Sequence, residues 1–233
     1  MIYFFRPIKN KCMKKVSFKE VLNRNMNLIR DKVTDGVFIM FHRKSDDFPL
    51  MVKPDKWASD QSRGEIAEGV VVVEGGKILV VAPTETALTW SSAAVSGGGT
   101  STDDRLVALN DWNGKSSTAA QIKHPECSGV DYAPGFCAAY ERVNANGKGL
   151  TAGRWWLPSL GELMMIYANM RKINYALSLV NGATQLSKTG YWSSTELSAT
   201  YGWYLNLSNG IAGPWTTKAT TQFRVRPVSA FLQ

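Results

Sequence analysis

Two valine-rich runs flank Glu74-Gly75-Gly76 in the stretch GVVVVEGGKILVVAP, residues 69–83. β-Branched residues favour strands, and a glycine pair readily takes the positive φ angles of a tight hairpin turn. The stretch therefore predicts an antiparallel β-hairpin, and GVFIMFH at residues 36–42 predicts a further strand. Residues 44–57 are expected to form a connection.

A capping box marks the best-defined helix. Ser159 follows Pro158 and precedes Glu162 by three residues, which predicts a helix that begins after Ser159. Its inward-facing residues are expected to be Leu160, Leu163, Met164 and Tyr167. Asn174 is expected to cap a second short helix that ends at Asn181-Gly182, and short strands are predicted in GYWSST, GWYLNLS and FRVRPVSAF. This mixture of helices and short strands makes the predicted fold class α+β.

Residues 17–33 predict an amphipathic helix with a basic outer face. Ser17 and Glu20 form a capping box, and six apolar residues share one stripe: Phe18, Val21, Leu22, Met26, Ile29 and Val33. Two interpretations stay open. The helix packs on the body of the protein, or it serves attachment or self-association.

The positive charge of the chain is concentrated at its start. Residues 1–32 contain nine lysines and arginines against Glu20 and Asp31, which gives +7 and leaves about +1 of the total of +8 for the rest. Because the body is nearly neutral, a surface that follows nucleic-acid phosphates is not expected.

The cysteines and the apolar runs do not identify the cellular compartment in which the protein acts. Cys12, Cys127 and Cys137 form no Cys-x-x-Cys pair, so neither a zinc site nor a disulfide framework is expected. Cys127 and Cys137 either form one disulfide or stay reduced, and Met1 and Met13 are both possible starts. No secretory signal is recognisable and no apolar run is long enough to span a membrane.

No set of residues has the spacing of a catalytic site. The chain contains two histidines, His42 and His124, and His124 with Cys127 or Cys137 is the one conceivable nucleophile pair. Asp103, Asp104 and Asp111 lack the pattern of a calcium loop, and residues 111–114 are interpreted as a turn. We therefore expect no catalytic residue, no metal site and no cofactor.

Residues 197–221 differ from their surroundings in composition. The segment consists mostly of small, polar and aromatic residues, and Lys218 is its single charged residue. If WYLNLS is a strand, Tyr204, Asn206 and Ser208 lie on one face and the leucines on the other. Such a mixture is typical of binding surfaces, but it is also compatible with an ordinary half-exposed strand followed by a Gly-Pro loop.

Several motifs together resemble a known family. RWWLPSLGELMMIY, INYAL, YWSSTE, WYLNLSNG and RVRPVSAF occur in this order, and GVVVVEGGKILVVAP, LTWS, NGKSSTA and CAAYE precede them. The combination is similar to a bacterial and phage domain family of unknown function with a C-type-lectin-like fold. That family includes the variable proteins of diversity-generating retroelements. The resemblance covers residues 66–233, which leaves residues 1–65 as an N-terminal extension that is expected to serve attachment or oligomerisation, for example as a trimer.

The resemblance implies a division between fixed and variable residues. The fixed scaffold would include Tyr191, Trp192, Ser193, Ser194, Arg224, Arg226 and Pro227. Tyr191 and Trp192 are expected to pack in the core, and Tyr201 and Tyr204 are expected to face solvent. The ligand-binding positions would be Leu197, Ser198, Ala199, Thr200, Tyr201, Tyr204, Asn206, Ser208, Ile211, Ala212, Trp215, Thr216, Thr217, Ala219, Thr220 and Thr221. Adenine-directed mutagenesis of an Asn codon ending in C reaches all of these residue types except tryptophan, so Trp215 is either fixed or derived from another codon.

The implied function is non-enzymatic binding of a cell-surface protein or glycan, by a protein of a phage virion or of a bacterial surface. One alternative is a structural virion or surface protein with a fixed lectin-like domain. Another is an enzyme of the formylglycine-generating type, although residues 138–233 contain no cysteine. The calcium motifs of sugar-binding C-type lectins are absent.

Overall fold

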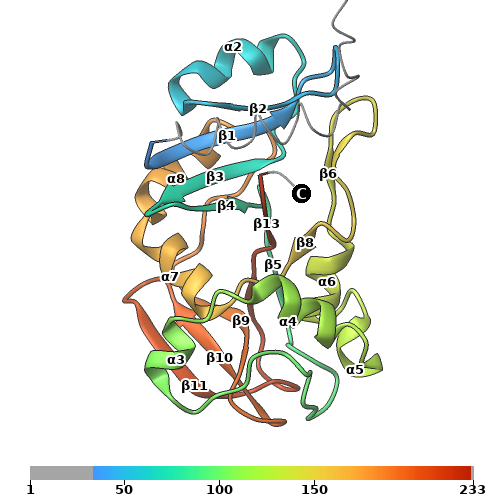
Figure 1. Ribbon diagram of the computed structural model, residues 1–233, viewed down its shortest axis with the longest axis vertical. Helices are drawn as coiled ribbons and strands as arrows, with labels where there is room; N and C mark the ends of the chain where they lie inside the picture. The colour runs from blue at the N-terminus through green and yellow to red at the C-terminus, as the bar shows by residue number, and fades with distance from the viewer. Residues whose placement is uncertain (1–33, 232–233) are drawn as a thin grey trace, which may run out of the picture. The chain divides into compact units, whose positions relative to one another are not determined.

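Six strands form a first sheet, sheet A, in the order β2-β1-β3-β4-β13-β8 (Figure 1). The structure is a computed structural model that describes residues 34–231, and these residues belong to one compact unit. The strands are β1 (Gly36–His42), β2 (Pro49–Val52), β3 (Gly69–Glu74), β4 (Lys77–Val81), β8 (Trp155–Trp156) and β13 (Val228–Ser229). All neighbouring strands of sheet A are antiparallel.

The predicted hairpin and the predicted strand at residues 36–42 are both confirmed. β3 and β4 pair down to Glu74 opposite Lys77, and the turn residues Gly75 and Gly76 have φ angles of 54° and 76°. The connection expected at residues 44–57 contains regular structure that was not predicted, namely β2 and the short 3-10 helix η1 (Pro54–Lys56). β2 forms because residues 50–52 pair with the second half of β1 and cover its edge.

A second sheet, sheet B, has the order β11-β10-β9-β12-β5. Its strands are β5 (Thr86–Leu88), β9 (Gly190–Glu196), β10 (Tyr201–Asn206), β11 (Ile211–Thr217) and β12 (Phe223–Val225). β12 runs parallel to β9, and the other neighbours are antiparallel. The Gly-Pro loop that the sequence allowed after β10 is instead the edge strand β11, since it pairs with β10 from Tyr201 opposite Thr217 to Asn206 opposite Ile211.

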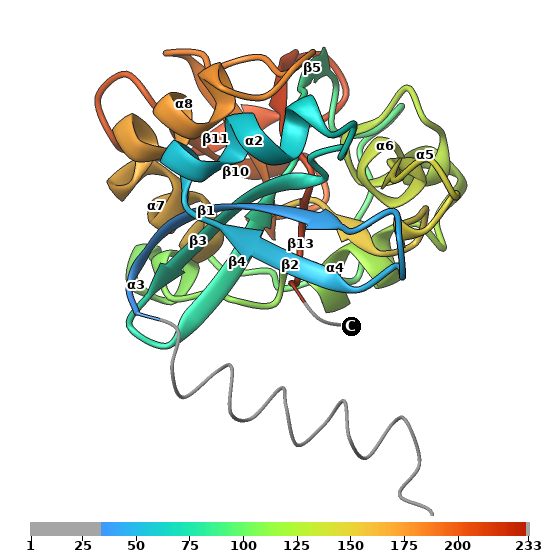
Figure 2. The same ribbon diagram turned by 90° about the horizontal axis from the view of Figure 1, so that it is seen from above.

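The helices lie in groups around the two sheets. They are α2 (Trp57–Ser62), α3 (Arg105–Leu109), α4 (Gly114–Gln121), α5 (Pro125–Ser128), α6 (Ala133–Ala139), α7 (Leu160–Ala168) and α8 (Met170–Ser178), and a small ribbon consists of β6 (Arg142–Val143) and β7 (Gly149–Leu150). Figures 1 and 2 both show α5 and α6 on one side and α7 and α8 on the other. Together with the antiparallel sheets, these helices confirm the α+β class.

The capping box of α7 is confirmed, but the predicted start of the next helix is wrong. Ser159 accepts a hydrogen bond from the backbone of Glu162, whose side chain accepts one from the backbone of Ser159. α8 begins at Met170 rather than after Asn174, which lies inside the helix. The Asn174 side chain instead accepts a hydrogen bond from the backbone N–H of Leu186 (2.7 Å) and so holds the segment that follows α8.

α7 lies in the centre of the larger hydrophobic core. It contacts β3 of sheet A and β9 and β10 of sheet B, and Leu160, Leu163 and Ile166 are buried there. A second cluster lies on the other face of sheet B and includes Trp90 and Trp192. Sheet B is therefore covered by apolar side chains on both faces at its centre, while β11 remains at its edge.

The compact unit begins before the boundary that the resemblance implied. β1 and β2 fall within residues 34–65, and β1 pairs along β3 from Gly36 opposite Val73 to Met40 opposite Gly69. This part of the N-terminal extension is thus continuous with sheet A. The predicted amphipathic helix at residues 17–33 lies outside the described residues, and the attachment role remains a prediction.

Candidate functional site

The segment 197–217 starts and ends at a buried ion pair. Glu196 closes β9, Lys218 follows β11, and Lys218 Nζ lies 2.5 Å from Glu196 Oε2. Both side chains are buried, and the ammonium group also lies 4.2 Å from the centre of the Trp90 ring. Burial lowers the pKa of Lys218, and the Glu196 carboxylate opposes this shift. We call Glu196 and Lys218 the buried clamp, because their pairing holds together the two ends of the segment between them.

A second polar network fixes the residues that the resemblance assigned to the scaffold. Glu85 accepts hydrogen bonds from Tyr191 Oη (2.5 Å), Arg226 Nε (3.0 Å) and Ser187 Oγ (2.6 Å). Arg226 is buried and also donates to the carbonyl groups of residues 82 and 184, each at 3.0 Å. Burial raises the pKa of the Tyr191 hydroxyl, and the neighbouring Glu85 carboxylate raises it further.

The other proposed scaffold residues are also held in the interior, except Arg224. Trp192 is buried and donates from Nε1 to the Leu88 carbonyl (3.0 Å). Ser193 donates to the Trp203 carbonyl at 2.9 Å. Ser194 and Pro227 are buried, whereas Arg224 is half-buried. The expectation that Tyr191 and Trp192 lie in the core is confirmed.

The sixteen proposed ligand-binding residues lie on three connected pieces of sheet B: the β9–β10 turn, the β10–β11 hairpin, and the turn after β11. The exposed residues are Ser198, Ala199, Thr200, Ser208, Ile211, Trp215 and Thr220. The half-buried residues are Leu197, Tyr201, Tyr204, Asn206, Thr216, Thr217, Ala219 and Thr221. Ala212 is buried in the larger core, so its side chain does not reach the surface.

Trp215 is the most prominent side chain on these pieces. It is 74% exposed although it lies within a strand. The edge of its ring packs near Tyr201, with ring centres 5.6 Å apart and an interplanar angle of 73°. Because the exposed tryptophan is supported by a second aromatic residue, it presents a broad apolar surface in a defined orientation.

Two other candidates contribute mainly to the structure of the hairpin. The Tyr204 ring packs against Phe223, with centres 4.6 Å apart, and against the backbone of Gly213, where a Cβ would lie 2.5 Å from the ring. Tyr204 was expected to face solvent, but it is half-buried for this reason. Asn206 Oδ1 accepts hydrogen bonds from the backbone and the hydroxyl of Ser208 and thereby shapes the turn.

The cysteines do not form a reactive site with His124. Cys127 and Cys137 are both reduced and buried in the cluster that contains Trp90 and Trp192. Burial raises the pKa of Cys127 to about 12 and that of Cys137 well above its ordinary value, so both thiols stay protonated near neutral pH. His124 precedes α5, where its backbone caps the helix.

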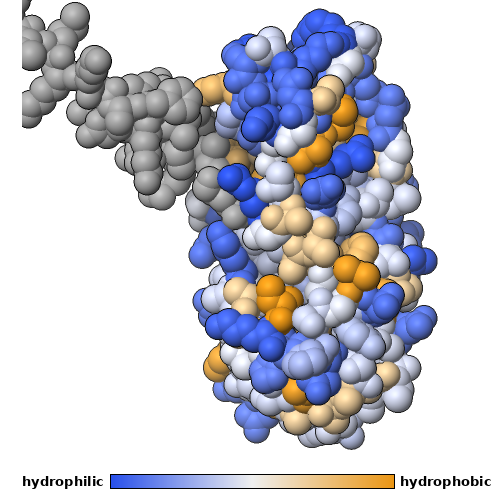
Figure 3. Space-filling view, turned by 90° about the vertical axis from the view of Figure 1, so that its right-hand side faces the viewer, coloured by the Kyte–Doolittle hydropathy of each residue, from blue (hydrophilic) through white to orange (hydrophobic). Residues whose placement is uncertain are grey.

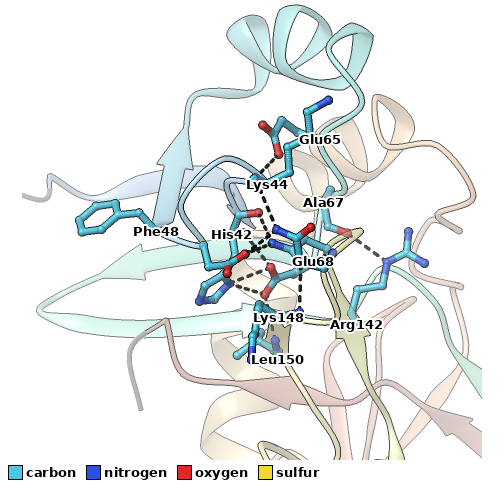
Figure 4. Close-up of polar contacts among 12 residues, drawn as sticks. His42, Lys44, Phe48, Glu65, Ala67, Glu68, Arg142, Lys148 and Leu150 are labelled. Atoms are coloured by element: carbon cyan, nitrogen blue, oxygen red, sulfur yellow. Dashed lines mark hydrogen bonds and ion pairs between the residues drawn. The ribbon is translucent and has the colours of Figure 1, made fainter.

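A histidine–carboxylate pair lies at the far end of sheet A (Figure 4). His42 Nδ1 lies 2.8 and 2.9 Å from the two oxygens of buried Glu68, which also accepts the backbone N–H groups of His42 (2.7 Å) and Leu150 (3.1 Å). Asn144 donates to the His42 carbonyl at 3.2 Å. A carboxylate can orient a histidine as a base, but no residue labelled in Figure 4 carries a hydroxyl or thiol to be activated. The pair joins β1 to the β6–β7 ribbon.

Metal sites and membrane spans are not found in residues 34–231. No three histidine, cysteine or acidic side chains there are grouped to hold a metal ion. Asp104 caps α3, and Asp111 accepts hydrogen bonds from Asn113 N (2.9 Å) and Thr195 Oγ1 (2.8 Å). The turn predicted at residues 111–114 is wrong in part, because Gly114 is the first residue of α4. None of the described helices has the length and apolar character required to cross a membrane.

The comparisons with known proteins found one distant similarity. No protein-family model matches the chain, and no curated protein matches it. A crystal structure of a fimbrial protein from Bacteroides ovatus is similar, with a TM-score of 0.46 and 18% sequence identity. The match covers 65% of this chain and 35% of that one, so this chain corresponds to about a third of the fimbrial protein.

Sequence reasoning missed the residues that support the candidate surface. Lys218 was visible as the single charge in its segment, but its partner Glu196 and the contact with Trp90 were not. The role of Glu85 was also missed, because it lies more than 100 residues before Tyr191. Both groups of contacts join segments that are distant in sequence.

Proposed function

We propose that this protein binds a partner non-covalently through the surface formed by residues 197–221, which we call the display segment. The observation that carries the proposal is Trp215, a 74% exposed tryptophan held against Tyr201 on an edge strand. Tryptophan and tyrosine frequently contribute most of the binding energy of an interface. Water leaves such a surface readily when a partner covers it.

The separation of buried and exposed residues in sheet B supports a display role. Six of the seven residues that would be fixed are buried, and Tyr191 and Arg226 among them hydrogen-bond to Glu85, whereas fifteen of the sixteen proposed ligand-binding residues are at least partly exposed. Exposed side chains can change without disturbing the core, so this arrangement tolerates sequence variation where a partner would bind. Ala212 is excluded from the proposed surface because it is buried.

We infer a C-type-lectin-like scaffold from the resemblance in the sequence, and with it a retroelement-diversified protein. The DNA around the gene tests the second point. A near-copy of the codons for residues 190–231 beside a reverse-transcriptase gene, with differences at adenines that cluster in residues 197–221, is the expected result. A gene without such a copy, and without variation among isolates, would identify a fixed adhesin or a structural protein instead.

The partner is a protein or glycan on a cell surface, and the protein is part of a phage virion or of a bacterial surface. The N-terminal extension, residues 1–65, would then provide attachment or assembly into an oligomer such as a trimer. This location follows from the family resemblance and is independent of the exposed tryptophan.

Binding to intact cells tests the display role directly. The full chain, labelled with a fluorophore, would be mixed with cells of the bacterium that carries the gene or its phage, and with related strains, and analysed by flow cytometry. Trp215→Ala is expected to reduce binding about tenfold or more. Tyr175→Ala, which removes another exposed aromatic residue from α8, is the matched control and should bind like the original protein.

Two results would contradict the proposal. The first is unchanged cell binding by Trp215→Ala, with the same melting temperature as the original protein. The second is a stable oligomer in solution that dissociates on Trp215→Ala, because Trp215 would then be a subunit contact and the protein would have the structural role.

A further inference from the structure

A loop from another part of the chain lies beside the display segment. Residues 92–101, which we call the glycine loop, connect β5 to α3 and contain no charged residue. Figure 1 shows this stretch and the turns of β9–β11 at the same end of the molecule. The amide of Thr102 donates to the Glu196 carbonyl (2.9 Å), and Ser101 forms a parallel bridge with Glu196.

The buried clamp holds the glycine loop and the display segment together. Gly97 N donates to Glu196 Oε2 at 2.8 Å, Gly99 N donates to Oε1 at 3.3 Å, and Lys218 Nζ donates to the Val95 carbonyl at 2.9 Å. Three points of the loop are thus bound to the same ion pair that closes the display segment. The loop has a fixed position relative to that segment.

At two of these points the backbone of the loop lies so close to core side chains that only glycine fits. A Cβ on Gly97 would lie 2.7 Å from Gln121 and 2.9 Å from Trp90, and a Cβ on Gly99 would lie 2.7 Å from Ser117. Since the backbone itself fills the space above the core, the side chains between the anchored points turn outward. Ser92, Ala93, Ala94 and Ser96 are all exposed.

Neither segment exposes a charge; the exposed charged residues that follow the glycine loop are Asp103, Asp104 and Arg105. The single charged residue in the two segments, Lys218, is buried and paired with Glu196. The backbone N–H groups of Trp90 and Ser91 donate to the Lys218 carbonyl, so the start of the loop reaches the display segment three residues after Trp215. Figure 3 shows the right-hand side of Figure 1, where the lower end of the molecule carries fewer dark blue residues than the upper end.

We propose that the glycine loop is a second, fixed wall of the binding surface, and that the surface takes a neutral saccharide. This inference rests on the proposed function. The apolar face of a sugar ring packs on an exposed indole such as Trp215, and serine and threonine hydroxyls exchange hydrogen bonds with sugar hydroxyls. Threonine hydroxyls are concentrated beside Trp215, where Thr217 Oγ1 lies 2.6 Å from that of Thr220 and 3.1 Å from that of Thr221.

The absence of exposed charge in the two segments disfavours charged partners. Acidic glycans and nucleic acids are held by cations, which residues 92–101 and 197–221 do not expose. Protein interfaces share the aromatic anchors but are depleted of serine and alanine, and the exposed side chains of the glycine loop include Ser92, Ala93, Ala94 and Ser96. A neutral saccharide requires no cation, and its binding is expected to change less than about twofold between about 50 and 500 mM salt because no exposed charges of the two segments are screened.

The test uses the full chain and two sets of immobilised oligosaccharides, one neutral and one carrying sialic or uronic acids. Binding to at least one neutral oligosaccharide is expected, with loss on Trp215→Ala. Ala94→Asp places a carboxylate in the glycine loop and should weaken binding about tenfold or more, because the charge must lose water when the sugar covers it. Ala58→Asp adds the same charge at an exposed position of α2 and should bind normally.

The outcomes separate this inference from the proposed function. If Ala94→Asp binds as the original protein does, the glycine loop is not part of the surface. If cells are bound through Trp215 but no neutral oligosaccharide is, or if high salt abolishes binding, the saccharide assignment is wrong and the display role stands. If the original protein binds neither cells nor oligosaccharides, the proposed function fails and this inference fails with it.

Discussion

At the scale of single residues, the candidate surface depends on a contrast between Trp215 and Lys218. Three positions separate them, yet Trp215 is 74% exposed and Lys218 is fully buried. A single lysine among uncharged residues is normally solvated. Lys218 is buried because Glu196, the Val95 carbonyl and the Trp90 ring together replace the water that its ammonium group loses.

Replacing Lys218 with methionine is expected to destabilise the protein by about 3–5 kcal/mol, because it leaves the Glu196 carboxylate buried without its partner. Urea unfolding followed by fluorescence measures the change. The double variant Glu196→Gln/Lys218→Met removes both charges and should be more stable than the single variant. A loss below about 1 kcal/mol on Lys218→Met would show that the ion pair does not hold the base of the display segment.

Glu162 makes stability depend on pH. Burial raises the pKa of its carboxyl group from the ordinary 4.5 to about 7, while hydrogen bonds from Ser159 and Trp156 partly oppose the shift. Between these two pH values the unfolded chain loses the proton and the folded chain keeps it. The free energy of unfolding should therefore fall by up to about 3 kcal/mol as the pH rises from about 4.5 to about 7.

Urea unfolding at several pH values between 4.5 and 8 measures this dependence. Glu162→Gln keeps an acceptor for the Ser159 amide but does not titrate, so its stability should change less over the same range. Identical pH profiles for the two proteins would mean that Glu162 titrates normally in the folded state.

At the scale of elements, the sequence correctly predicted those helices and strands that are determined by residues close together in the sequence. The β3–β4 hairpin follows from its glycine turn, and α7 follows from its capping box. β2 and β11 were missed because each is an edge strand, and its conformation depends on the strand it pairs with. Pro214 within β11 argued for a loop, but proline is tolerated in an edge strand.

The glycine loop gives a prediction at this scale. Gly97→Ala should destabilise the protein by about 1–3 kcal/mol, because the added methyl group would overlap Gln121, Glu196 and Trp90. Ser96→Thr adds a methyl group at the neighbouring exposed position and should change stability by less than about 0.5 kcal/mol. Equal stability of the two variants, measured by urea unfolding, would contradict the close contact of the loop with the buried clamp.

At the scale of the whole molecule, the sequence predicted the α+β class but placed the start of the compact unit too late. The motifs that carry the resemblance begin near residue 66, whereas pairing of β1 with β3 extends the unit to residue 34. Periodicity reveals a strand without revealing its neighbour in the sheet. The candidate surface was located by composition, whereas the clamp and the loop that support it required the fold.

Two truncated proteins test whether the compact unit begins at residue 34 or at residue 66. Residues 34–233 should unfold cooperatively, because sheet A is complete. Residues 66–233 lack β1, β2 and three side chains of the larger core that are at most 1% exposed: Ile39, Phe41 and Trp57. Removing even one such side chain costs about 2–5 kcal/mol, which is comparable to the whole stability of many domains, and it would leave β3 as a hydrophobic edge strand.

The shorter fragment is therefore expected to aggregate or to show no cooperative thermal transition by circular dichroism, whereas the longer one elutes as a folded species in size-exclusion chromatography. If residues 66–233 melted cooperatively at the temperature of the longer fragment, β1 and β2 would be a dispensable addition to sheet A. In that case β1 and β2 would belong to the attachment region predicted for residues 1–65. Residues 1–65 could then be replaced without loss of the surface at Trp215.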